Sequence, residues 1–456
     1  MSAHSIGGLV ALNVILLVVG STTLYALRGF SSWNEVLRLG GVAYMLGVAV
    51  TGVLFVLELV VGLSLSLPAI LVTEAALAGA GLLTGRLLGR PAPGVRMTVD
   101  RISVWAAVFA GLLIIYLEAL FRSGRLAGLY EFDGWAFWVP KAKAIYYFGG
   151  LDRQFFTELP GAAYPPLVPG FEAASFHFMG STDVVTLHLQ FWFFLVGFVA
   201  AVAGLYAGRA PALLLWPPLL LLLVTPHVLR YALQAEGDFL LDELFALAAL
   251  VVGLWLIEPR AWQLAAATLL LGAGMSTKRE GYLLAGCIVF AALAASARRA
   301  RTVWPRLLLA AGVALAFTIP WRVLLAVRNL SGGGPEAGGT GLFHHLDRAW
   351  PSLRLTLSTL FDFDIWLVVA PLALVAIAAA ILAQRRQLAL YALLLFALAV
   401  AAFTWTTWAF PSLPITKEAA LNPMPRLTGS LTFAATAVVP LLLGAAWPPR
   451  FGRATR

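Results

Sequence analysis

Charged residues and cysteine are both scarce in this sequence. Asp, Glu, Lys and Arg together make up 12% of the 456 residues, whereas hydrophobic residues make up 61%. A soluble globular protein carries about 25% charged residues, so this composition excludes a cytosolic enzyme. The single cysteine, Cys287, excludes an intrachain disulfide and a thiolate metal site. Disorder is also excluded, because 28 Phe, 15 Trp and 11 Tyr residues are too many for an unfolded chain.

What remains is an all-α polytopic membrane protein with a mean hydropathy of +0.89. A bilayer core about 30 Å thick needs roughly 20 apolar residues per helix. The apolar runs between charged or Pro- and Gly-rich breaks predict about 13 transmembrane helices, near residues 6–27, 39–62, 67–84, 103–121, 184–207, 211–229, 239–257, 261–275, 282–297, 307–325, 363–384, 388–407 and 428–446.

The distribution of charge predicts the orientation of these helices. One set of loops holds 17 of the 31 Lys and Arg residues with only three acids, and the opposite set holds the other 14 with 16 acids. Cytoplasmic loops collect Lys and Arg, so we expect an external N-terminus and a cytoplasmic C-terminus in the plasma (inner) membrane. The net charge of +9 is therefore a topology signal, and no nucleic acid partner is expected.

The long external segment 122–183 holds the first candidate functional residues. Asp133 follows the fourth predicted span directly and lies close to Glu131 and Trp135. A carboxylate that loses water at the membrane boundary is a plausible general base. The alternative is that Asp133 caps the N-terminus of a short helix that lies along the interface. The sequence leaves these two roles open.

Two further features follow in the same segment. Residues 141–148 read as an amphipathic interfacial helix whose lysines lie near lipid headgroups. The run Tyr164-Pro165-Pro166-Leu167-Val168-Pro169 reads as a rigid, non-helical turn, because proline fixes φ and removes a backbone donor. Such a turn could form the wall of a pocket that includes Tyr164, or simply lead back to the next span.

Acids also open the seventh predicted span. Asp238 falls at its external end, which makes it a second candidate catalytic residue. Asp242 and Glu243 lie just inside, where acids are costly and point to function. Alternatively, these two face water and favour the helix N-terminus through its dipole.

A basic turn joins the eighth and ninth predicted spans on the external side. It reads Thr277-Lys278-Arg279-Glu280-Gly281. External cations run against the positive-inside rule, whereas Lys and Arg suit a phosphate group. Glu280 would hold one cation in place, or it would only pair with it to close the turn. Arg426, which follows a Pro-rich approach, is a further candidate anion ligand.

The sequence contains no sign of a metal or nucleotide cofactor. His344 and His345 are adjacent and lack spaced partners, so no metal site is expected there. There is no P-loop or dinucleotide-binding glycine pattern either.

The order and sidedness of these motifs resemble the GT-C superfamily of integral membrane glycosyltransferases. The resemblance rests on Asp133, the Tyr164-Pro165-Pro166-Leu167 turn, Gly237-Asp238 and the 277–281 turn. It implies an inverting transfer of sugar from a polyprenyl-phosphate donor to a glycan, lipid or protein acceptor. It also implies that Asp133 is the general base and that Lys278, Arg279 and Arg426 bind the donor phosphate. Glu131, Trp135, Tyr164 and Glu280 would line the substrate pocket, and no cofactor is implied.

Members of the superfamily usually carry their acidic loop after the first span, whereas three spans precede it here. We therefore expect an added N-terminal three-helix module at residues 1–102, a catalytic region at 103–446 and a basic cytoplasmic tail at 447–456. The alternatives are a flippase for lipid-linked saccharides and a polysaccharide polymerase. A transporter should show internal repeats and broken helices near the midplane, and no convincing repeat is present.

Overall fold

The protein folds as a bundle of helices. The computed structural model describes residues 3–94, 104–126, 128–152, 156, 158–159, 161–329, 345–410, 415–416 and 423–446. Within this part of the chain, 82% of the structure is helical and no strand is present. The predicted tail 447–456 and His344 lie outside the described residues.

Nine helical stretches among the described residues are long and apolar enough to cross a bilayer. These stretches are α1 (Ala3–Arg28), α3 (Gly40–Val60), α4 (Leu67–Leu87), α5 (Val104–Gly124), α9 (Val184–Tyr206), α12 (Gly237–Ile257), the run Ala297–Val327, α20 (Arg386–Ala409) and α21 (Pro423–Ala446). Four shorter apolar helices accompany them: α10 (Ala212–Leu223), α13 (Ala261–Met275), α14 (Glu280–Ala295) and α19 (Val369–Leu382). The chain is a multi-pass membrane protein.

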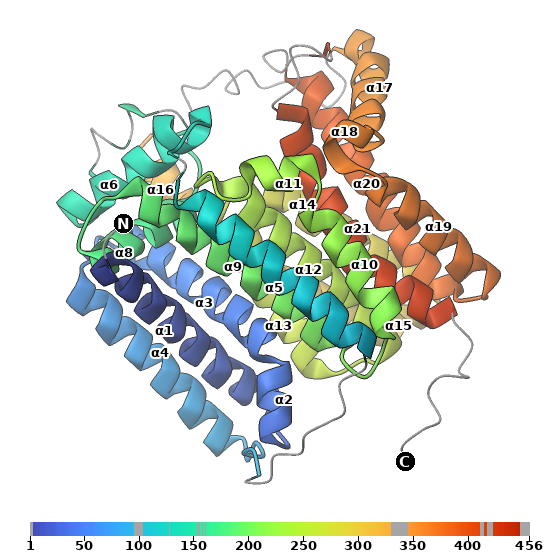
Figure 1. Cartoon of the computed structure of the whole chain (residues 1–456), viewed down its shortest axis with the longest axis horizontal. Helices are drawn as coiled ribbons and strands as arrows, with labels where there is room; N and C mark the ends of the chain where they lie inside the picture. The colour runs from blue at the N-terminus through green and yellow to red at the C-terminus, as the bar shows by residue number, and fades with distance from the viewer. Residues whose placement is uncertain are drawn as a thin grey trace.

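Short helices occupy the two ends of the bundle. They are α2 (Trp33–Arg38), η1 (Gly134–Trp138), α6 (Val139–Phe148), α8 (Leu167–Met179), α11 (Pro226–Tyr231), η2 (Ala297–Arg299), α15 (Ala300–Ala316), α16 (Ile319–Val327), η4 (Leu346–Arg348), α17 (Ala349–Leu360) and α18 (Phe363–Trp366). Of these, η2, α15 and α16 together make up the long run 297–327, and α15, with 17 residues, lies between the two ends rather than at one of them. In Figure 1, α6, α16 and α17 lie at one end, here called the α6 end, and α2 marks the opposite α2 end.

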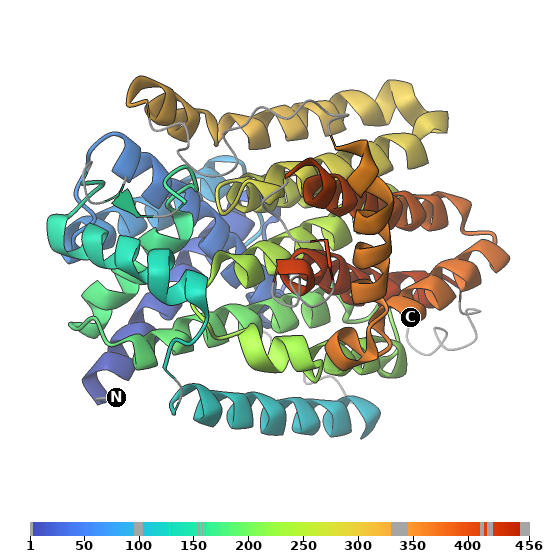
Figure 2. The ribbon, with the colours of Figure 1, turned by 90° about the horizontal axis from the view of Figure 1, so that it is seen from above.

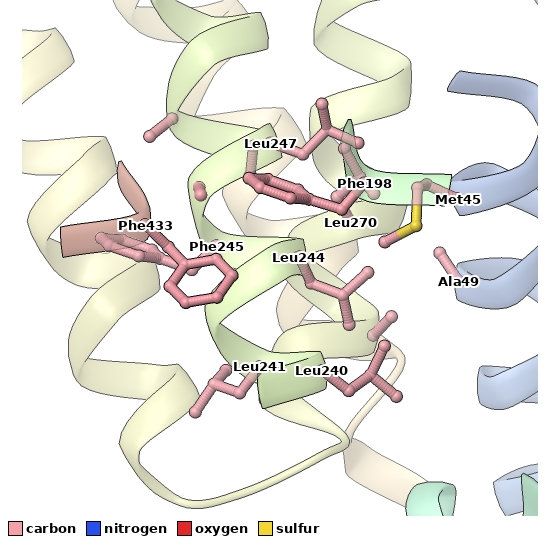
Figure 3. Packing of buried hydrophobic residues seen from close by; sticks show 14 of the residues in the cluster. Met45, Ala49, Phe198, Leu240, Leu241, Leu244, Phe245, Leu247, Leu270 and Phe433 are labelled. Carbon is pink, nitrogen blue, oxygen red and sulfur yellow. The ribbon is translucent and has the colours of Figure 1, made fainter. Parts of the chain in front are cut away.

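Helix α12 forms the centre of the bundle. In its most apolar stretch of 18 residues, 94% of the residues are buried. This burial is expected for a helix that is apolar on all sides. It packs most extensively against α21 and α13. Figure 3 shows this packing, with Leu244 and Phe245 of α12 surrounded by side chains from α3, α9, α13 and α21. By contrast, only 11% of the residues in the corresponding stretch of α5 are buried, and this helix lies at the periphery in the view of Figure 2.

The N-terminal helices pack through small residues. A Cβ on Gly20 of α1 would lie 1.7 Å from the carbonyl oxygen of Ala43, and one on Gly47 of α3 would lie 1.9 Å from that of Leu16. Glycine therefore allows the two backbones to touch, as is common between membrane helices. Helix α3 also packs against α9 and α13, and one hydrophobic core runs through all of them. The boundary at residue 102 stays a prediction.

The segment 122–183, which the charge pattern predicts to be external, is more deeply packed than the sequence indicates. The predicted helix at 141–148 is present as α6, but Lys141 is only 1% exposed and does not face headgroups. Its ammonium donates to the carbonyl oxygen of Gly161 at 2.6 Å and lies over the rings of Phe137 and Phe156. The predicted non-helical turn ends at Pro166, because residues 167–169 form the first turn of α8.

Candidate active site

A charged cavity of about 410 Å³ opens at the α6 end of the bundle. Seven of the nine residues proposed from the sequence line it: Asp133, Tyr164, Asp238, Lys278, Arg279, Glu280 and Arg426. They come from five separate places in the chain, namely the start of η1, the turn before α8, the 236–238 segment, the 276–281 segment and the start of α21. The fold thus brings together side chains that are up to 293 positions apart.

Arg426 joins the two candidate catalytic acids. Its Nη2 atom donates to Asp133 Oδ2 and, at 2.6 Å, to Asp238 Oδ2, while its Nε lies 3.2 Å from the latter oxygen. The Asp133 side chain makes no capping bond to the helix that follows. The capping alternative is therefore wrong, because this carboxylate points across the cavity to α21 rather than back to its own backbone.

Lys278 holds Asp238 from the other side. Its ammonium lies 2.7 Å from Asp238 Oδ1, and both side chains are only 8% exposed. Burial alone would lower the pKa of Lys278, but the charges of Asp238 and Glu280 outweigh it and raise the pKa. Lys278 also lies 5.6 Å from the centre of the Tyr164 ring. The lysine is therefore charged and fixed in the cavity wall.

The turn that carries Lys278 is rigid. The hydroxyls of Ser276 and Thr277 donate to the carbonyl oxygens of Gly272 and Ala273 at 2.8 and 2.9 Å. Glu280 Oε1 lies 4.0 Å from the Lys278 ammonium, within ion-pair range. Three residues of the tight turn, Lys278, Arg279 and Glu280, consequently project into one cavity.

Glu236 is a buried acid beside Arg426 that was not among the residues proposed from the sequence. Its carboxylate lies 3.5 Å from Arg426 Nε and is 1% exposed. Burial raises its pKa to about 8; Arg426 opposes this shift, and Asp238 and Asp133 reinforce it. The Glu236 side chain is therefore largely protonated at neutral pH. Arg426 and Lys278 are then balanced by Asp133 and Asp238.

The remaining wall of the cavity holds cations and aromatic rings. Arg322 of α16 lies 3.2 Å from the Tyr282 hydroxyl and 4.7 Å from the centre of the Tyr282 ring. Trp405, Thr406 and Phe410 close the same wall at the end of α20. Sequence reasoning missed these last three, since they read as the apolar end of a span. In the sequence, Arg322 is a cation near the end of an apolar run, and nothing there separates it from residues that contact headgroups.

Two proposed pocket residues do not line this cavity. Trp135 is 53% exposed and packs edge-on against Phe132. Glu131 is buried, and its backbone N–H faces the Gln234 side chain at 3.4 Å. Each lies two positions from Asp133, where the turn of the helix directs its side chain elsewhere.

Asp242 and Glu243 do not face water. Each is 2% exposed, and Asp242 accepts a hydrogen bond from the Ser430 hydroxyl. The alternative that these acids face water is wrong, because both are buried and α21 covers this part of α12. Polar groups thus continue from the cavity into the bundle. A further buried acid, Glu74 of α4, accepts a hydrogen bond from the Thr51 hydroxyl of α3 at 2.8 Å.

No family model, curated protein or solved structure matches this chain. The fold and the site define a multi-pass helical membrane protein with a charged cavity at one end.

Proposed function

We propose that this protein is a membrane glycosyltransferase that moves a sugar from a polyprenyl-phosphate donor to an acceptor. The observation that carries the proposal is the convergence of Asp133, Asp238, Lys278, Arg279 and Arg426 on one cavity. The cavity combines acids that can accept a proton with cations that suit a phosphate. The motif order resembling the GT-C superfamily supports the same activity and an inverting outcome.

The proposal includes a topology of thirteen spans. It counts the nine long apolar stretches together with α10, α13, α14 and α19, which are shorter. The charge asymmetry of the loops supports an external α6 end in the plasma membrane. The cavity would then face the periplasm or the cell exterior, where lipid-linked donors present their sugars.

In this mechanism, Asp133 accepts the proton of the acceptor hydroxyl. The acceptor oxygen forms a bond with the anomeric carbon, and the bond from that carbon to the phosphate oxygen breaks, leaving its electron pair on the phosphate. Lys278 and Arg279 would stabilise the departing phosphate. Arg426 would orient Asp133, with which it shares a hydrogen bond, and add positive charge near the donor. Asp238 fixes both Lys278 and Arg426.

The second candidate function is a flippase for the same class of lipid-linked saccharide. The buried acids Asp242 and Glu243 below the cavity favour it, because acids within spans often mark a transport route. The glycosyltransferase remains the better supported function. The reason is that Asp133 pairs with Arg426 and Asp238 pairs with Lys278, so acids lie directly beside the cations that would bind a leaving phosphate.

Substitution of Asp133 tests the catalytic role. Asp133→Asn keeps the shape of the side chain but cannot accept the proton, and a positioned base contributes about 10²–10⁴-fold in rate. We expect the rate of sugar transfer to fall by that factor while donor affinity is retained. Asp364→Asn is the matched control, since Asp364 is exposed at the start of α18 and does not line the cavity. Near-wild-type turnover of Asp133→Asn would remove it from the catalytic role.

A further inference from the structure

A second cavity, of about 790 Å³, lies at the α2 end of the bundle. It is formed where α9, α12 and α21 end and where η2 and the turn before α20 begin. Because α12 rises about 1.5 Å per residue, its last turn lies about 30 Å from Asp238. The two cavities are therefore separate sites on opposite ends of the same helices.

Five arginines line this cavity against a single acid. The arginines are Arg209, Arg298, Arg299, Arg385 and Arg386, and the acid is Glu258. Glu258 is 53% exposed; it lies 3.3 Å from Arg260, which does not line the cavity, and 3.9 Å from Arg209, which does. A concave surface of one sign concentrates its electrostatic field and attracts counter-ions. The cavity therefore carries an excess of positive charge and favours the binding of an anion.

Three of these arginines are held in place by helix ends. Arg299 donates to the carbonyl oxygen of Leu256 at 2.9 Å, Arg385 to that of Ala445 at 2.9 Å and Arg209 to that of Leu205 at 2.7 Å. Such bonds satisfy the last carbonyls of α12, α21 and α9. Each uses one or two of the five N–H donors of a guanidinium, so the arginines are positioned and still have donors for a ligand.

Apart from Gln384 and Gln387, the latter accepting a hydrogen bond from Arg299 at 2.9 Å, most of the remaining cavity wall is apolar. Leu254 and Ile257 of α12, Leu388 of α20 and Pro440 and Leu441 of α21 contribute to it. A small inorganic anion would use the arginines and leave this apolar wall exposed. A ligand with a phosphate head and a hydrocarbon chain would use both.

We propose that this cavity binds an anionic phospholipid, with its phosphate on the arginines and its acyl chain along α12 and α21. Recognition depends on two independent features, a cluster of guanidinium groups and an adjacent apolar wall. This site does not depend on the sugar-transfer activity at the α6 end.

Calorimetric titration of the purified full-length protein in an uncharged detergent tests the proposal. The probes are dioctanoyl phosphatidic acid, dioctanoyl phosphatidylcholine and inorganic phosphate. The variant is Arg298→Gln with Arg386→Gln, which leaves the three carbonyl-bonded arginines intact. The matched control, Arg86→Gln with Arg301→Gln, removes the same charge from exposed positions of α4 and α15 that do not line the cavity.

We expect phosphatidic acid to bind the wild type more tightly than either other probe, and the cavity variant to bind it about tenfold more weakly or worse. The control variant should bind as the wild type does. Ile257→Gln, at a position that is 48% exposed, should weaken phosphatidic acid without changing the phosphate result. Equal losses in the cavity and control variants would overturn the proposal in favour of a general surface charge effect. Equal affinities for phosphatidic acid and inorganic phosphate would overturn it in favour of a free anion.

Discussion

The two ends of the bundle hold cavities of opposite electrostatic design. In the cavity at the α6 end, Lys278 is matched to Asp238 and Arg426 to Asp133. At the α2 end, five arginines line a cavity with one exposed acid. A balanced cluster holds its groups in fixed geometry and suits chemistry, because proton acceptors and anion ligands lie side by side. An unbalanced cluster attracts an anion and suits binding. The total basic charge of a cavity therefore indicates its role less well than the pairing of each cation with an acid does.

The first way to test this comparison is to ask whether the two cavities open on opposite sides of the membrane. Single cysteines at Lys143 of α6 and Arg301 of α15 can be introduced after Cys287 is replaced by alanine. We expect an all-or-none difference in intact cells, with an impermeant thiol reagent labelling position 143 only. Labelling of position 301 from outside would reverse or abolish the proposed orientation.

The largest difference in stability should come from the same substitution made at each end. Arg426→Gln leaves Asp133 and Asp238 without a shared partner, and breaking a buried ion pair costs about 3–5 kcal/mol. Arg386→Gln, in the arginine cavity, should change stability little, because removal of one like charge relieves repulsion there. Unfolding of both variants in mixed micelles provides the measurement. Equal effects would show that Arg426 is not held in a balanced cluster.

Donor binding should depend on the basic turn. We expect Lys278→Ala or Arg279→Ala to weaken binding of a polyprenyl-phosphate sugar by about 1.5–3 kcal/mol, the range for a charged hydrogen bond. Lys143→Ala is the control, since this lysine lies on α6 outside the cavity lining. Unchanged affinity in both turn variants would leave Lys278 and Arg279 with a structural role only.

A smaller effect concerns pH and Glu236. Its pKa is about 8 in the folded protein against an ordinary value of 4.5, mainly because of burial. Between these two pH values the folded state binds more protons at Glu236 than the unfolded state does. The contribution of Glu236 to the free energy of unfolding is therefore fully present below pH 4.5 and is lost as the pH rises to 8. The slope from this one group is at most about 1.4 kcal/mol per pH unit.

Glu236→Gln should remove this part of the pH dependence, since glutamine stays neutral. Comparing the stabilities of the wild type and Glu236→Gln from pH 5 to 8 isolates the contribution of Glu236 from that of other groups. Parallel curves would mean that Glu236 is ionised in the folded state and belongs to the ion-pair network.

Sequence patterns predicted the helical membrane class because hydropathy records which segments avoid water. They also pointed to residues such as Asp133 and Lys278, since charges at the ends of apolar runs stand out. They could not predict that Arg426 bridges Asp133 and Asp238, because that contact joins segments far apart in the chain. Trp405 and Phe410 were missed for a different reason: an aromatic residue at the end of a span looks the same whether it faces lipid or a cavity.

The buried position of Lys141 shows the same limit. Two lysines on a short amphipathic helix predict contact with headgroups, yet one of them, Lys141, is buried against the Phe156 ring and donates to the carbonyl oxygen of Gly161. Periodicity gives the faces of a helix but not what covers each face. Only the tertiary fold supplies that information.

The most direct test of the central proposal uses the wild-type protein reconstituted in liposomes with a polyprenyl-phosphate sugar labelled in the sugar. Candidate glycan, lipid and protein acceptors are supplied on the side of the α6 end. The glycosyltransferase proposal predicts that the label becomes covalently attached to an acceptor, with inverted anomeric configuration. Movement of the intact labelled donor across the bilayer, with no transfer to any acceptor, would contradict it and favour the flippase.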